Sequence, residues 1–233
     1  AMDPIANQAA KMRYMFGGTT SVPIVIRAPF GAYVSMSAHH SQSLESWFSS
    51  IPGLKVVIPS TPYDAKGLMK SAIRDDNPVI FSDHKRLGGL VGEVPEDDYV
   101  VPIGKANIAR SGKDATIVAY GFMIQKSLES AEQLSKKGID VEIVDLRTTL
   151  PIDEDTILNS VAKTGRLITV AEACAPCSVA SEVATIVFEK GFDLLKAPLK
   201  RIHARFAPIP FAANLENQVL PQTDDIISAF EDM

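Results

Sequence analysis

The sequence lacks a block of lysine and arginine residues, and its formal net charge is −5. It therefore has no large cationic field to hold nucleic acid or an acidic membrane surface, and we expect neither partner. It also lacks an apolar run near the roughly 20 residues that a membrane helix needs. Residues 1–30 lack the charged-then-apolar pattern of a signal peptide, so we expect a soluble, intracellular protein.

Several catalytic signatures are absent as well. The chain has no G-x-G-x-x-G and no G-x-x-x-x-G-K-[ST], which disfavours a dinucleotide-binding or P-loop enzyme. It also has no G-x-S-x-G and no H-E-x-x-H, the motifs typical of serine hydrolases and zinc proteases, which disfavours both classes. Cysteine is scarce, because Cys174 and Cys177 form a single C-x-x-C. This spacing fits a redox pair or half a zinc site, but no histidine pair has the spacing to complete a zinc site; the alternative is two small buried thiols on a loop.

The composition and the apolar pattern predict an α/β protein. Hydrophobic residues make up 46% of the 233 residues and charged residues 22%, as in ordinary globular proteins, and the length favours two domains. Short apolar runs alternate with amphipathic segments, which predicts a mainly parallel sheet with right-handed connections. We expect strands at residues 22–28, 54–58, 78–81, 115–120, 141–146, 166–171 and 200–204, and helices at 3–15, 43–51, 64–73, 124–137, 153–163, 179–192 and from about 223.

A polar, interrupted stretch near residues 92–106 predicts the connection between two domains, which we place at 1–98 and 99–233. Ligands of open α/β sheets bind beyond the carboxyl ends of the strands. The loops that follow Ala28, Phe81, Tyr120, Leu146 and Ala171 are therefore the expected places for a site.

One cluster of polar side chains lies in the first of these loops. Residues 37–42 contain His39, His40 and two serines, between a glycine-containing loop and the start of a helix. Imidazole titrates near neutral pH, so either ring is suited to moving protons or holding a developing oxyanion. The alternative is that Ser41 or His40 simply caps the helix that begins near Ser43.

A second cluster lies where the helix ending at Ile73 stops before Pro78. Free backbone carbonyls at the helix end, together with Asp75 and Asn77, form an oxygen-rich place for a hard cation. The alternative is that these side chains are ordinary solvated residues at a helix end.

Several motifs together resemble those of one enzyme family. They include His40-Ser41-Gln42-Ser43-Leu44-Glu45, Pro52-Gly53-Leu54-Lys55-Val56-Val57, Gly92-Glu93-Val94-Pro95, Pro102-Ile103-Gly104-Lys105 and Val144-Asp145-Leu146-Arg147-Thr148, and matching segments cover essentially the whole chain. The sequence resembles β subunits of the E1 component of thiamine-diphosphate-dependent 2-oxo-acid dehydrogenases and of acetoin dehydrogenases. The resemblance implies an N-terminally truncated pyrimidine-binding domain, followed by a transketolase C-terminal-type α/β domain.

The resemblance also implies cofactors, partners and site residues. Thiamine diphosphate would be shared with an E1 α subunit that holds Mg2+, and a second β subunit and a lipoyl-bearing E2 would complete the assembly. Carried over by position, His40 is the histidine of the family's Q-H-S-Q motif, near the substrate. The family's cation site, which takes K+ mostly through main-chain oxygens, maps onto Ile24, Ala72, Ile73, Asp75 and Asn77.

The sequence departs from the family pattern at several positions. His39 replaces the glutamine before His40, and Tyr33, Ser35 and Ser37 stand where small residues or glycine are usual. The glutamate that activates the cofactor is expected in a segment that would precede the first helix of this chain. No cofactor-binding residue is therefore assigned within the sequence.

The leading hypothesis is an E1 β subunit that acts with an α subunit. Together they would decarboxylate pyruvate or a branched-chain 2-oxo acid, or cleave acetoin, and pass the acyl group to lipoyl-E2. The alternative is a catalytically inactive β fragment that docks on the α subunit or on E2. A third possibility, a fragment of a single-chain transketolase-like enzyme, fits the fold but matches the His40 segment less well. The expected location is the cytoplasm in a bacterium or archaeon, and the mitochondrial matrix or plastid in a eukaryote.

Overall fold

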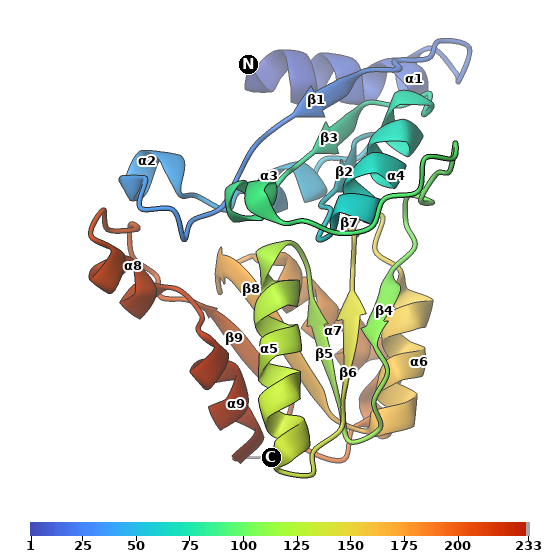
Figure 1. Ribbon diagram of the computed structural model, residues 1–233. Helices are drawn as coiled ribbons and strands as arrows, with labels where there is room; N and C mark the ends of the chain where they lie inside the picture. The colour runs from blue at the N-terminus through green and yellow to red at the C-terminus, as the bar shows by residue number, and fades with distance from the viewer. Residues whose placement is uncertain (232–233) are drawn as a thin grey trace.

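The chain folds around two mainly parallel β-sheets, each with helices on both faces (Figure 1). The structure is a computed structural model, and it describes residues 1–231. The α/β fold class predicted from the sequence is confirmed. No helix within residues 1–231 is both long and apolar enough to cross a bilayer.

The first sheet has four strands, of which the last comes from the C-terminal half of the chain. In spatial order they are β1 (Val25–Arg27), β3 (Val79–Phe81), β2 (Lys55–Val57) and β7 (Thr148–Leu150). The first three are parallel, and β7 is antiparallel to β2. One face packs on α4 (Pro62–Ile73), and the other packs on the N-terminal helical segment and on residues around α3 (Glu45–Ser49). That N-terminal segment is a π-helical turn, Pro4–Ala9, that continues directly into α1 (Ala10–Met15).

The second sheet has five strands. In spatial order they are β4 (Asn107–Arg110), β6 (Val141–Asp145), β5 (Ala115–Ala119), β8 (Leu167–Cys174) and β9 (Lys200–Ala204), with only β4 antiparallel to its neighbour. Successive side chains of a strand point to opposite faces. Ile117 therefore packs with α5 (Phe122–Lys136) and α9 (Thr223–Glu231), whereas Val118 packs with α6 (Glu154–Thr164) and α7 (Val179–Gly191). Figure 1 shows these two helix pairs on opposite sides of the sheet.

Local signals in the sequence set the ends of several helices. Asp153 caps α6 by accepting the N–H of Thr156, and Gly165 ends that helix in the left-handed conformation with φ 75°. Ser178 caps α7 in the same way, by accepting the N–H of Ser181 at 3.2 Å. These caps satisfy backbone groups that a helix end leaves unpaired.

Some predicted elements differ from the structure. The predicted strand at residues 22–28 is wrong in length, because only Val25–Arg27 pairs in a ladder and Pro23 has no N–H to donate. The predicted helix at 43–51 is also too long, since α3 covers only Glu45–Ser49. The two antiparallel strands, β4 and β7, and the short helix α8 (Ala213–Val219) were not predicted. Each of these three elements has at most 7 residues, too few for a periodic pattern to stand out.

Candidate functional site at the carboxyl ends of the strands

The loop after β1 passes through three residues in the left-handed conformation. Tyr33, Ser35 and Ser37 have φ values of 64°, 53° and 65°, a region that favours glycine. The buried carboxyl of Glu216 stabilises this path, because it accepts the main-chain N–H groups of Tyr33 and Ser35, each at 3.1 Å. This backbone geometry accounts for the small residues or glycine that the resemblance leads one to expect at the same positions.

Two buried side chains join this loop to the second sheet. Glu172, from β8, accepts the N–H of Ala32 at 2.5 Å and the hydroxyl of Ser43 at 3.2 Å through Oε1. Its Oε2 lies 2.6 Å from Nε2 of His84, and the two side chains are 4% and 1% exposed. Nδ1 of His84 accepts the N–H of Arg86 at 3.1 Å, so the ring proton is on Nε2 and is donated to Glu172.

His40 lies at a cavity of about 310 Å³ beyond the carboxyl ends of β1 and β3. His39 and His40 end the short helix α2 (Ser37–His40), and both are exposed. The other lining residues come from the loop after β1, from the α3 segment and from the loop after β3: Ala28, Pro29, Phe30, Gln42, Leu44, Glu45, Phe48, Ser82 and Lys85. Neither His40 nor Ser41 caps α3, because the residue at its N-cap is Leu44. The helix-capping alternative is therefore wrong.

Lys85 supplies a cation at the same cavity. Burial lowers the pKa of its ammonium group, and the charges of Glu172 and Asp83 oppose that shift. Its Nζ donates to the carbonyl of Gly31 at 3.3 Å. An ammonium group beside two imidazoles gives this side of the cavity hydrogen-bond donors suited to carboxylate or carbonyl oxygens.

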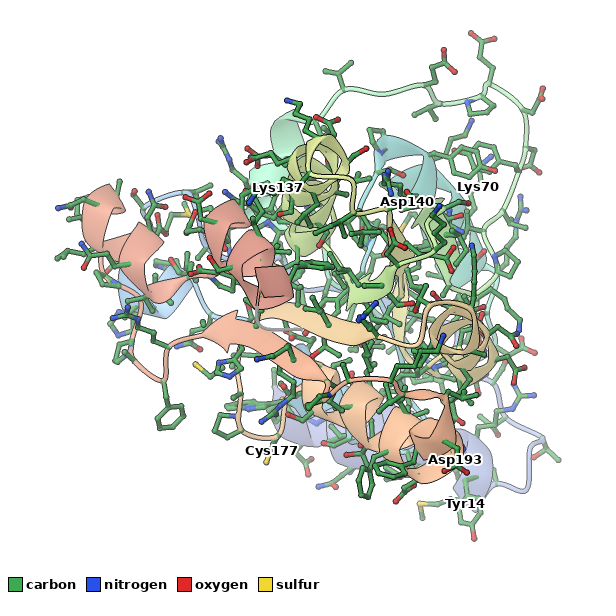
Figure 2. All side chains as sticks on the ribbon, turned by 90° about the horizontal axis from the view of Figure 1, so that it is seen from below. Tyr14, Lys70, Lys137, Asp140, Cys177 and Asp193 are labelled. Carbon is green, nitrogen blue, oxygen red and sulfur yellow. The ribbon has the colours of Figure 1, made fainter. Side chains whose placement is uncertain are left out.

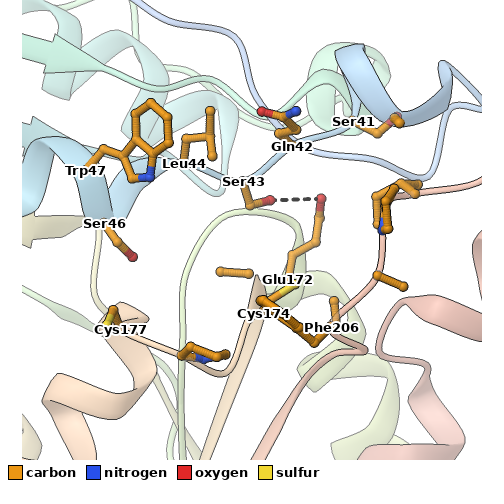
Figure 3. Close-up of a pocket in the computed structure, with 17 residues that line it drawn as sticks. Ser41, Gln42, Ser43, Leu44, Ser46, Trp47, Glu172, Cys174, Cys177 and Phe206 are labelled. Carbon is orange, nitrogen blue, oxygen red and sulfur yellow. Dashed lines mark hydrogen bonds between the residues drawn. The ribbon is translucent and has the colours of Figure 1, made fainter. Parts of the chain in front are cut away.

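A second cavity, of about 390 Å³, lies between the α3 segment and the ends of β8 and β9 (Figure 3). Ser43 and Glu172 point toward each other across its interior, and Trp47 and Phe206 contribute aromatic surface. Both cavities are lined in part by Gln42 and Leu44, so the segment that follows His40 separates them. The loops after β1 and β8 therefore line one continuous region beyond the carboxyl ends of the strands. This is where open α/β sheets bind their ligands.

The residues predicted to form a cation site are brought together at the C-terminal end of α4. The N–H of Val79 donates to the carbonyl of Ile24 at 3.0 Å, which places the start of β1 beside this helix end. Oδ1 of Asp75 accepts the main-chain N–H and the side-chain amide of Asn77, each at 2.9 Å, and Oδ2 forms an ion pair with Lys55. The carboxylate of Asp75 is therefore already engaged with Asn77 and Lys55.

Both cysteines are free thiols. Cys174 ends β8 and its Sγ lies 3.4 Å from the carbonyl of Arg205, whereas Cys177 is exposed on the loop before α7, at the periphery of the molecule in Figure 2. The prediction of two buried thiols on a loop is therefore wrong for both, since Cys174 is half-buried at the end of a strand and Cys177 is exposed. Within residues 1–231 no group of three or more histidine, cysteine or acidic side chains is arranged to hold a metal ion.

Comparison with known proteins decides the family. Residues 104–226 match the transketolase C-terminal domain, and residues 2–89 match the transketolase pyrimidine-binding domain. The chain is 45% identical over 235 residues to the 2-oxoisovalerate dehydrogenase subunit beta of Bacillus subtilis (strain 168), covering 100% of this chain and 72% of the relative. This chain belongs to the E1 β-subunit family.

The E1 β chain has further relatives of the same kind. It is 52% identical over 226 residues to the acetoin:2,6-dichlorophenolindophenol oxidoreductase subunit beta of Bacillus subtilis (strain 168), covering 97% of the chain and 66% of the relative. It is 51% identical over 230 residues to the pyruvate dehydrogenase E1 component subunit beta of Rhizobium meliloti (strain 1021), covering 98% of the chain and 50% of that relative. The chain thus spans about two-thirds of the length of the acetoin oxidoreductase subunit and half of the length of the pyruvate dehydrogenase subunit.

A solved structure shares the fold of the E1 β chain. A split-gene transketolase, described as an inactive beta4 tetramer, superposes with a TM-score of 0.76 at 22% identity, covering 99% of this chain and 72% of that one. At this identity the likeness concerns the fold alone. It matches the α/β arrangement of two sheets described above.

The sequence did not single out the buried acids of the site. Glu172 lies in a strand of otherwise mostly buried apolar residues, and Glu216 and Glu45 are also buried. Charged residues are almost never fully buried without a partner. A glutamate within an apolar strand was therefore the signal that could have identified Glu172 from the sequence.

Proposed function

We propose that this E1 β chain acts with an α subunit in the thiamine-diphosphate-dependent conversion of a 2-oxo acid or of acetoin, with transfer of the acyl group to a lipoyl-bearing E2. The relatives named for acetoin, pyruvate and 2-oxoisovalerate support this proposal. The observation that carries it is the position of His40, which lines a cavity of about 310 Å³ beyond the carboxyl ends of β1 and β3. This is where an α/β sheet holds its ligand.

In this proposal the α subunit holds Mg2+ and the diphosphate group, and this chain forms one wall of the shared site. Thiamine diphosphate supplies carbanion stabilisation when it is bound. The residues of this chain orient the substrate, because Lys85 and the two histidines present donors at the cavity. His40 is suited to transferring a proton to or from a substrate oxygen, because an imidazole ring can both donate and accept a proton.

The test is turnover by the natural polypeptide that carries these residues. It is combined with an α subunit, thiamine diphosphate and Mg2+, and is supplied with pyruvate, 2-oxoisovalerate or acetoin. We expect turnover with one of these substrates, and His40→Ala to lower kcat/KM by about 100-fold. The matched control is His39→Gln, which introduces the residue usual in the family pattern and should retain activity. Absence of turnover with every substrate contradicts the proposal and favours the docking-module alternative.

We also propose that K+ binds at the C-terminal end of α4. The carboxylate of Asp75 is engaged with Asn77 and Lys55, so main-chain carbonyls are the expected main ligands, and the residues concerned are Ile24, Ala72, Ile73, Asp75 and Asn77. K+ should therefore raise the melting temperature, because a ligand that binds only the folded state stabilises it. Tetramethylammonium at the same ionic strength is the control, and an equal rise with both cations contradicts a specific site.

The proposed assembly contains two α and two β subunits, with E2 as the acceptor of the acyl group. Relatives described as subunits beta support a multi-subunit complex. Relatives occur in bacteria and in mitochondria, so the bacterial cytoplasm and the mitochondrial matrix are the proposed compartments. Light scattering of the purified chain with and without the α subunit measures the assembly, and a β chain whose mass is unchanged by the α subunit contradicts it.

A further inference from the structure

The segment that carries His40 is a loop whose two ends lie side by side. The N–H of Gly31 donates to the carbonyl of Gln42 at 3.1 Å, which joins the chain before His40 to the chain after it. The imidazole of His40 is exposed and makes no hydrogen bond to another residue within 1–231. The position of this ring is therefore set by the path of the loop that contains it, residues 31–43.

One carboxylate oxygen holds both ends of this loop. Oε1 of Glu172 accepts the N–H of Ala32 at 2.5 Å near the first end and the hydroxyl of Ser43 at 3.2 Å near the second. Figure 3 shows the bond to Ser43. Glu172 is buried on β8 of the second sheet, 140 and 129 positions away from these two partners. A buried strand of another sheet therefore clamps the loop that carries His40.

The two halves of the loop depend on different supports. In the first half, Glu216 accepts two main-chain N–H groups, as described above. In the half that contains His40, residues 36–43, Ser43 has the only hydrogen bond to the C-terminal domain, and its acceptor is Glu172. The bond from Ser43 to Glu172 is therefore the hydrogen bond to the C-terminal domain that lies nearest in sequence to His40.

We propose that Glu172 is a positioning residue for His40: by holding Ala32 and Ser43 on one oxygen atom, it keeps the imidazole at the substrate cavity. The inference rests on the proposed function, because it takes His40 as the group that transfers a proton in this cavity. Proton transfer needs the ring within hydrogen-bond reach of the substrate oxygen, and a misplacement of about 1 Å can lower a rate by roughly 100-fold. A loop without its clamp lets His40 leave this position while the fold remains.

The clamp is measurable without turnover. Ser43→Ala removes one of the two loop bonds to Glu172 and leaves the bond from Ala32 in place. Ser46→Ala is the matched control, because Ser46 lines the same cavity as Glu172 and makes no hydrogen bond to it. Amide hydrogen exchange of the natural polypeptide, followed by mass spectrometry, should be about 10-fold faster in residues 31–43 of Ser43→Ala and unchanged in β5, whereas Ser46→Ala should match the wild type in both. Equal exchange of residues 31–43 in the two variants overturns the proposal.

Kinetics of the reconstituted enzyme test whether the clamp acts through His40. With the α subunit, thiamine diphosphate and Mg2+, Ser43→Ala should lower kcat by about 10-fold, and Ser43→Thr, which keeps a hydroxyl, should retain most of the rate. In the His40→Ala background Ser43→Ala should cause no further loss, because the effects of two groups that act as a unit are not additive. A loss of equal size with and without His40 shows a structural role alone and overturns the inference, as does a Ser43→Ala enzyme with full activity.

Glu172→Leu extends the test to the clamp itself. This variant removes both bonds to the loop and also the bond from His84, so it should lower kcat further than Ser43→Ala does and should also lower stability. If the variant does not fold, the test rests on Ser43→Ala. A folded Glu172→Leu enzyme with the kcat of the wild type overturns the inference. Absence of turnover in the wild type contradicts the proposed function instead, and hydrogen exchange then decides whether Glu172 holds the loop.

Discussion

Nε2 of His84 donates to Oε2 of Glu172 at 2.6 Å, and this contact joins the loop after β3 to the second sheet. The histidine ring also packs edge-on against Phe30 and is stacked on Phe122, the first residue of α5. The same carboxylate holds the N–H of Ala32 in the loop after β1. One buried pair therefore fixes the relative positions of both loops that line the cavity of His40.

Replacing His84 with alanine should destabilise the fold. The change removes a hydrogen bond to a buried charged group and leaves one oxygen of Glu172 without its partner, at a cost of about 3 kcal/mol. The free energy of unfolding, measured in urea, checks this value. The control is His203→Ala on β9. The ring of His203 is partly buried and its Nδ1 lies 3.1 Å from the carbonyl oxygen of the adjacent Ala204, so this change should cost about 1 kcal/mol or less. Equal losses in the two variants would contradict a special role for the buried pair.

Replacing Gly31 with alanine should be more damaging than the same change at another left-handed glycine. An added Cβ at Gly31 would lie 2.1 Å from Nε2 of His84, so the ring and its bond to Glu172 must move. Gly17 is the matched control, because it has φ +60° but no atom within 4 Å of the added Cβ. We expect Gly17→Ala to cost about 1 kcal/mol, from backbone strain alone. Gly31→Ala should cost about 3 kcal/mol or more, and similar unfolding free energies for both would refute the predicted clash.

The sequence predicted the alternation of strands and helices and the position of His40, because both depend on local patterns. Periodicity over five or more residues identified β5, β6, α5 and α6. The contacts that build the site are not local: Glu172 binds Ala32 over 140 positions and Glu216 binds Tyr33 over 183. A single sequence carries no signal for such pairings. The strand β7 was missed because it is short and because its place in the sheet is set by pairing with the distant β2.

Replacing Ser37 with glycine should stabilise the protein. Ser37 has φ 65°, where a side chain costs roughly 1 kcal/mol that glycine does not incur. Part of that gain is offset because glycine has more freedom in the unfolded chain. We expect a net gain of about 0.5 kcal/mol in the free energy of unfolding. The control, Ser46→Gly within α3, should lower stability by about 1 kcal/mol, since glycine weakens a helix. A loss at Ser37 comparable to that at Ser46 would contradict the left-handed conformation.

Asp145 makes stability depend on pH at the junction of the two sheets. It is 1% exposed at the end of β6, and its Oδ1 accepts the hydroxyl of Ser60 and the N–H of Arg147, each at 3.1 Å. Arg147 in turn pairs with the buried carboxylate of Asp64 at 2.6 Å. Burial raises the pKa of Asp145 to about 7, the charge of Asp64 adds to the shift, and Arg147 opposes it.

The folded protein therefore keeps this proton up to about pH 7, whereas the unfolded chain releases it near pH 3.8. Because the folded state binds more protons between these values, stability falls as pH rises through this window, by roughly 4 kcal/mol in total. Asp145→Asn keeps an oxygen for Ser60 and Arg147 but cannot ionise, so its free energy of unfolding should lack this fall. Urea unfolding of both proteins at pH 5, 6, 7 and 8 measures the difference, and the gain from the substitution should grow with pH and level off above pH 7. A constant difference across the series would show that Asp145 is ionised in the folded protein throughout.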